Sequence, residues 1–172
     1  MKIVLLGYMG SGKSAVGQRL AEVLNMPFYD LDQEIEKKTK KNISEIFFEK
    51  GEIFFRKTEY EVLLDLLEAN ENYVLALGGG TPCYGNVMQL LKEHKSLTSI
   101  YLHTSLQELT DRLFSERKKR PLIAHIDTKE LLNDFVRKHI FERSYYYTQA
   151  HKKVQADAPV DKIVSEIVLQ LV

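Results

Sequence analysis

The stretch "GYMGSGKS" (Gly7–Ser14) follows the apolar run "IVLL" (3–6) and precedes a segment with helical spacing. It fits the pattern G-x-x-x-x-G-K-[ST], in which glycines allow backbone N–H groups to surround phosphate oxygens. The positive end of the following helix adds to that attraction. We therefore expect this loop to hold a nucleoside triphosphate, with Lys13 at its β- and γ-phosphates and the Ser14 hydroxyl on Mg²⁺. The alternative is a plain glycine-rich turn with Lys13 in solvent.

Strand-like and helix-like segments alternate along the chain. Strands are predicted at 2–7, 27–32, 73–77, 97–103 and 152–157, and helices at 13–25, 33–41, 42–51, 52–70, 85–94, 105–116 and 159–172. Residues 128–150 form one or two further helices, and a basic loop precedes them. This alternation predicts an α/β fold, with a five-stranded parallel sheet inside a three-layer α/β/α arrangement. Ligands of such sheets bind beyond the carboxyl ends of the strands, where the glycine and acid clusters of this chain fall.

The composition excludes several classes of protein. The 172 residues are enough for one domain with a substantial core. Basic and acidic residues number 24 each, which argues against a protein that binds nucleic acid through its overall charge. The single cysteine, Cys83, allows no internal disulfide and fits a reducing cytosol. We expect neither a signal peptide nor a membrane span.

Two acids end the second predicted strand. In an extended segment residues two apart point the same way, so Asp30 and Asp32 are both expected to face the crevice. Carboxylates beside a triphosphate can anchor Mg²⁺, directly or through water, or accept a proton from an attacking hydroxyl. Capping of the following helix is the alternative.

Further glycines and several arginines are ambiguous individually. Gly78–Gly80 end a strand, where they form either a flexible turn or a close approach to a ligand. Arg56, which lies among phenylalanines, either reaches to water or grips a carboxylate. The basic loop 117–121 and Arg143 are solvated, or they supply charge to a phosphoryl transfer. Together with the phosphate loop, these features predict transfer of phosphate to a small anionic acceptor.

In this order, the motifs resemble those of the shikimate kinase family, which has the nucleoside monophosphate kinase-like P-loop fold. The matching stretches are "GYMGSGKS", "DLDQEIE" (30–36), "ISEIFFEKGEIFFRKTE" (43–59), "LALGGG" (75–80), "RP" (120–121) and "ER…Y" (142–147). The phosphate loop is generic, whereas the second and third stretches are specific to the family. The resemblance covers essentially the whole chain.

The resemblance implies ATP-dependent phosphorylation of the 3-hydroxyl of shikimate, on the way to chorismate and the aromatic amino acids. It implies catalytic roles for Asp32, Lys13 and Arg120, and metal binding by Ser14 and Asp30. ATP would be bound by Gly10, Ser11, Gly12, Lys13, Ser14, Ala15, Arg112 and Arg120. Shikimate would be bound by Asp32, Arg56, Gly78, Gly79, Gly80, Arg143, Phe47, Phe55 and Glu59. Asp32 either removes the proton or only aligns the hydroxyl.

By the same resemblance, residues 1–172 form a single kinase domain, with a substrate-binding region at about 31–62 and a mobile lid at about 112–125. A cytoplasmic monomer that acts on shikimate and ATP, without nucleic-acid or membrane partners, is expected. Two alternatives remain open at this point. One is another small-molecule P-loop kinase such as a gluconate kinase, and the other is a nucleotide-binding module without catalysis.

Overall fold

The structure is a computed structural model that describes all residues from 1 to 172. Its centre is a sheet of five parallel strands in the order β2-β3-β1-β4-β5. The strands are β1 (Lys2–Leu6), β2 (Phe28–Asp30), β3 (Tyr73–Ala76), β4 (Leu97–His103) and β5 (Lys152–Gln155). The predicted five-stranded parallel sheet is confirmed.

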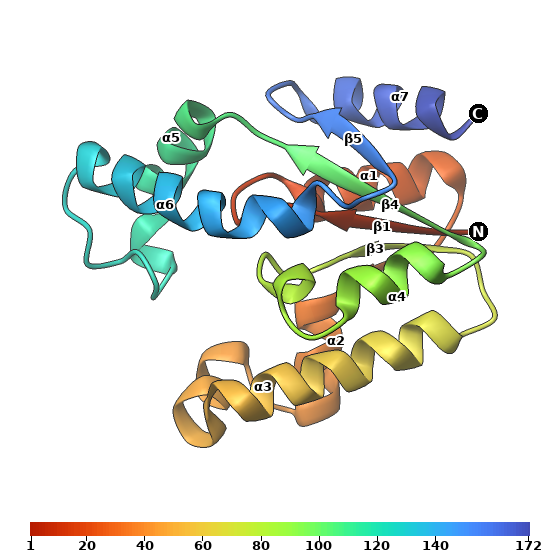
Figure 1. Cartoon of the computed structure of the whole chain (residues 1–172), viewed down its shortest axis with the longest axis horizontal. Coiled ribbons are helices and arrows are strands. Elements are labelled where there is room, and N and C mark those ends of the chain that lie inside the picture. The colour runs from red at the N-terminus through yellow and green to blue at the C-terminus, as the bar shows by residue number, and fades with distance from the viewer.

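Helices cover both faces of the sheet (Figure 1). They are α1 (Lys13–Leu24), α2 (Leu31–Thr39), α3 (Ile43–Glu68), α4 (Val87–Glu93), α5 (Leu106–Glu116), α6 (Lys129–Tyr147) and α7 (Val160–Leu171), with 3-10 turns η1 (Thr81–Cys83) and η2 (Arg117–Lys119). Residues 128–150, predicted as one or two helices, contain only α6. None of the helices combines the length and the apolar character needed to cross a membrane.

The central strand is buried on both sides. Ile3 and Leu5 belong to the core cluster that contains side chains of α1 and α7. Val4 and Leu6 belong to a second cluster, to which α2 to α6 contribute. Because successive strand residues point to opposite faces, a continuous apolar run is the expected sequence of such a strand. This central position of β1 places the loop that follows it in the middle of the carboxyl edge.

Helix α3 contains the two helical segments that the sequence predicts at 42–51 and 52–70. It begins with a capping box, in which Asn42 Oδ1 accepts from the backbone N–H of Glu45 and the Glu45 carboxylate accepts from the N–H of Asn42, both at 2.9 Å. Gly51 interrupts it with φ 83° and ψ 175°, a backbone conformation that side chains disfavour. The kink turns the aromatic first segment relative to the longer second one.

The prediction of an extended segment through Asp32 is wrong. Strand β2 ends at Asp30, and the Asp30 carboxylate caps α2 by accepting from the backbone N–H of Asp32 at 3.0 Å. A short polar acid is a favoured N-cap, so α2 begins at Leu31, directly after the last residue of the strand. Asp32 therefore lies in the first turn of α2, and the helix sets its orientation.

Candidate active site

The phosphate loop joins β1 to α1 beside a cavity of about 580 Å³. Gly12 is the N-cap of α1, with φ 89°, and no side chain caps this helix end. The first backbone N–H groups of α1 thus remain available to an anion, as the helix dipole favours. The residues that line the cavity are Met9, Gly10, Gly12, Lys13, Ser14, Ala15, Asp30, Asp32, Leu77, Gly78, Gly79, Arg112, Ser115, Glu116 and Arg120.

Lys13 places its ammonium group inside the loop. Nζ donates to the carbonyls of Gly7 (2.8 Å) and Tyr8 (2.9 Å). An ammonium group has three hydrogens, so one remains for a ligand oxygen. Burial lowers the pKa of Lys13 to about 8, although the charge of Asp32 opposes that shift. Lys13 is 9% exposed, so its ammonium group has lost most of its contact with water. The negative charge of a polyphosphate in the cavity would stabilise the protonated ammonium.

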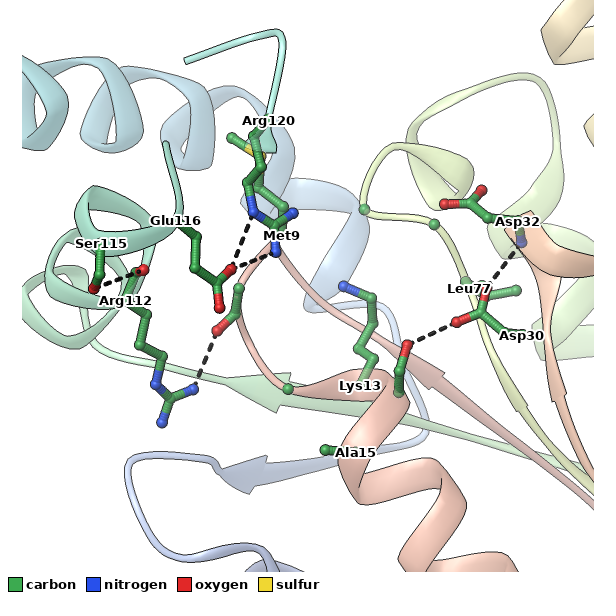
Figure 2. A pocket seen from close by; sticks show the side chains of 15 residues that line it. Met9, Lys13, Ala15, Asp30, Asp32, Leu77, Arg112, Ser115, Glu116 and Arg120 are labelled. Carbon is green, nitrogen blue, oxygen red and sulfur yellow. Dashed lines mark hydrogen bonds and ion pairs between the residues drawn. The ribbon is translucent and has the colours of Figure 1, made fainter. Parts of the chain in front are cut away.

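Ser14 and Asp30 form an oxygen pair at one wall of the cavity. Ser14 Oγ donates to Asp30 Oδ2 at 2.7 Å, while Asp30 Oδ1 caps α2 (Figure 2). The capping bond fixes the carboxylate, so its second oxygen faces the start of α1. A hydroxyl and a carboxylate beside a phosphate loop are hard oxygen donors, which Mg²⁺ prefers. This donor set fits the predicted metal.

Asp32 lies across the cavity from Arg120, with Lys13 between them (Figure 2). Burial, together with the neighbouring charges of Asp30 and Glu59, raises the pKa of Asp32 from 3.8 to about 6. A carboxylate with a pKa close to neutrality is a better proton acceptor than one at the ordinary value. The pKa of Asp32 therefore suits a general base as well as an orienting group.

A chain of hydrogen bonds runs from the second glycine run to Arg56. Thr81 Oγ1 donates to Glu59 Oε2 at 2.9 Å, and Arg56 Nη1 donates to Glu59 Oε1 at 2.8 Å. Glu59 is 3% exposed, so its charge depends on these two partners. The buried Nε of Arg56 has no partner in the protein. That unpaired N–H is the kind of group that a ligand carboxylate satisfies.

Two arginines from different helices converge on Gly80. A Cβ at this position would lie 2.8 Å from Nη2 of Arg56 and 3.3 Å from Nη2 of Arg143. Arg56 comes from α3, and Arg143 comes from α6. Both guanidinium groups approach the backbone of Gly80 on the side where a larger residue would carry its Cβ. Two adjacent guanidinium groups form a site for an anionic acceptor.

Helix α6 is held against both glycine loops. Tyr147 Oη donates to the carbonyl of Gly79 at 2.6 Å. The Tyr8 hydroxyl lies 2.8 Å from Nδ1 of His139. Burial lowers the pKa of His139, so the neutral imidazole can accept from the phenol. These contacts fix the helix that carries Arg143.

A second cavity, of about 1100 Å³, lies close to the first near the glycine run. Gly79 lines the first cavity and lies beside Arg143, which lines the second. Aromatic side chains bound this second space, and the rings of Phe47 and Phe55 pack 4.6 Å apart. Its lining residues are Ile43, Ser44, Phe47, Phe48, Glu52, Arg56, Tyr84, Pro121, Leu122, Phe135, Lys138, His139, Glu142 and Arg143.

Arg112 and Arg120 line the first cavity on the side opposite Asp32. Arg112 donates to the carbonyls of Gly10 (3.1 Å) and Ala156 (3.3 Å), so it joins the phosphate loop to the segment after β5. Arg120 forms an ion pair with Glu116 at 3.1 Å, four residues earlier (Figure 2). Its guanidinium is held at the cavity wall by a partner on the same segment.

The structure brings most of the predicted site residues to these two cavities. The exceptions are Ser11, Phe55, Glu59 and Gly80, which line neither cavity. Ser11 is buried within the phosphate loop. Phe55, Glu59 and Gly80 lie against Arg56 without lining either cavity themselves. Sequence reasoning missed Met9, Leu77, Thr81, Tyr84, Ser115, Glu116 and His139. Only Glu116 carried a signal, as an acid at the end of a predicted helix, four residues before Arg120.

Comparison with known proteins gives a consistent result. The family model described as "Shikimate kinase" matches residues 9–172. A shikimate kinase of Flavobacterium johnsoniae is 48% identical over 167 residues, which are 96% of each chain. The crystal structure of a Bacteroides thetaiotaomicron shikimate kinase superposes with a TM-score of 0.91 at 31% identity, covering 99% of this chain and 98% of that one. A shikimate kinase of Acinetobacter baumannii, solved in complex with shikimate, gives a TM-score of 0.83 at 33% identity, covering 99% and 91%.

Proposed function

The chain belongs to the shikimate kinase family, and we propose that it transfers the γ-phosphoryl group of ATP to the 3-hydroxyl of shikimate. The products are shikimate 3-phosphate and ADP. One observation supports this assignment above the others: the guanidinium groups of Arg56 and Arg143 meet at Gly80, next to a cavity where Asp32 and Lys13 face each other. An acceptor with a carboxylate at one end and a hydroxyl at the other fits that arrangement.

The acceptor is held at both ends in this proposal. Arg56 and Arg143 bind its carboxylate, and the unpaired Nε of Arg56 supplies a further donor. Asp32 accepts a hydrogen bond from the attacking hydroxyl. The hydroxyl oxygen forms a bond to the γ-phosphorus while the bond from that phosphorus to the bridging oxygen of ADP breaks. The hydroxyl proton passes to Asp32, whose pKa of about 6 allows it to act as the base.

The phosphate loop and Lys13 hold the triphosphate and neutralise charge on the transferring group. Ser14 and Asp30 would hold Mg²⁺, which when bound neutralises phosphate charge. We propose that residues from about 112 to 125 act as the lid, on which Arg120 leaves Glu116 to contact the phosphoryl group. Residues from about 31 to 62 would form the substrate-binding region, within one kinase domain.

We further propose that the enzyme is a cytoplasmic monomer whose partners are two small molecules, without nucleic-acid or membrane partners. The equal numbers of basic and acidic residues support the absence of a nucleic-acid partner, because they produce no overall field for a polyanion. Size-exclusion chromatography with light scattering tests the monomer. A mass near twice 19.9 kDa would contradict it.

A coupled ADP-release assay tests the function itself. The purified protein is given MgATP with shikimate, gluconate or a nucleoside monophosphate as acceptor. We expect ADP release only with shikimate. Turnover of gluconate or a nucleotide without turnover of shikimate would refute the proposal, and ATP binding without any turnover would indicate a non-catalytic module.

A further inference from the structure

Arg56 has open space on two sides. It lines the second cavity described above and also a separate cavity of about 510 Å³ between α3 and the loop before α4. An arginine side chain with several rotatable bonds loses much conformational freedom when it is fixed in one direction. Glu59 restrains one end of the guanidinium, at Nη1, whereas Nε has no partner. A further contact is needed to keep the group directed at Gly80.

Tyr84 provides that contact. Its ring stands 3.9 Å from Cζ of Arg56, and the ring of Phe55 lies 5.1 Å from the same atom. Tyr84 lines both cavities beside Arg56, so its ring stands where the two spaces adjoin. A guanidinium group is attracted to an aromatic face and lies flat against it. The ring thus limits movement of Arg56 toward the smaller cavity.

The ring itself is anchored. Tyr84 Oη donates to Oε1 of Glu52 at 3.0 Å. Glu52 follows the Gly51 kink of α3, and Tyr84 follows η1. The hydrogen bond therefore ties the loop after the second glycine run to the helix that carries Arg56. Burial and this bond raise the pKa of Tyr84, so the phenol stays protonated and keeps donating.

We infer that Tyr84 is a positioning residue that holds the Arg56 guanidinium in line with the acceptor carboxylate, using Glu52 as its own anchor. The inference rests on the proposed function. It predicts that Tyr84 acts on acceptor binding through Arg56 and has no effect on the nucleotide. Tyr84 contributes through its aromatic face and through its hydroxyl, and different substitutions remove the two contributions separately.

The test measures kcat and both KM values for wild type, Tyr84→Ala and Tyr84→Phe. We expect Tyr84→Ala to raise the KM for shikimate about 5- to 30-fold, as loss of a cation–π contact implies, with the KM for ATP within about 2-fold. Tyr84→Phe keeps the ring and loses only the bond to Glu52, so it should recover most of the shikimate affinity. Tyr145→Ala is the control, because this tyrosine is exposed on α6 and should change neither KM.

A double-mutant cycle with Arg56→Ala identifies the route of the effect. If Tyr84 acts through Arg56, Tyr84→Ala adds nothing to the KM for shikimate in the Arg56→Ala background. An equal increase in both backgrounds, or an unchanged KM in the single variant, would overturn the inference. If Tyr84→Ala does not fold, Tyr84→Leu replaces it and keeps the loop apolar. A wild-type enzyme without activity on shikimate would instead refute the proposed function.

Discussion

Replacing Asp32 with asparagine removes the proposed base and also relieves a cost to the fold. The rise of its pKa from 3.8 to about 6 corresponds to about 3 kcal/mol against the ionised carboxylate in the folded protein. Because the folded-state pKa lies above the unfolded one, the protonated form of Asp32 stabilises the fold relative to the ionised form, and this stabilisation is complete below pH 3.8. It is lost as the pH rises through about 6. Asparagine has no charge to bury at any pH.

We therefore expect Asp32→Asn to be more stable than wild type at pH 8, by up to about 3 kcal/mol, with a much smaller difference at pH 4. Urea unfolding of the two ligand-free proteins at both pH values measures this. We expect turnover to fall about 10²- to 10⁴-fold, the usual contribution of a general base. The affinity for ATP should stay nearly unchanged. A stability difference that is independent of pH would contradict this role of Asp32, and so would a loss of ATP affinity comparable to that of Lys13→Ala.

The same carboxyl group should control the acidic limb of the pH profile. For wild type, kcat/KM for shikimate should fall about tenfold per pH unit below about 6, where Asp32 is protonated. The charge of Glu59 contributes to that raised pKa, so Glu59→Gln should move the limb to lower pH. Titration of ATP in solution would produce a limb that does not move. An unmoved limb in Glu59→Gln would therefore contradict the assignment to Asp32.

Three other perturbations address the loop, the lid and the fold. Since burial lowers the pKa of Lys13 to about 8, kcat/KM for ATP should decline above that pH, and a profile flat to pH 10 would disagree. Arg120→Ala should lower kcat about 10³-fold with little change in either KM, whereas Glu116→Gln, which removes only an exposed ion pair, should stay within about fivefold of wild type. Equal losses in the two variants would count against the lid role. Gly17→Ala places a Cβ 2.5 Å from Cε2 of Phe28 and should cost about 1–3 kcal/mol in urea unfolding, despite the better helix propensity of alanine. A stabilised variant would disprove that packing argument.

The local features of the fold could be predicted from the sequence. The phosphate loop, the apolar runs that become strands and the position of the first helical segment of α3 follow from residue type and spacing within short stretches of the chain. The error at Asp32 was also local. Two acids separated by one residue fit both an extended strand and a helix start, and the Asp30 cap decides for the helix.

Residue type and spacing were enough to identify the phosphate loop, which lies in one short stretch of chain, and the α/β class, which follows from the alternation of strand-like and helix-like segments. The three-dimensional fold sets the strand order and brings Arg56 and Arg143 together at Gly80. It also decided the pKa of Asp32 and the contact of Tyr84 with Arg56. Each of these depends on burial and on neighbours that are distant in the chain. Desolvation and packing act through space, whereas capping and periodicity act along the chain.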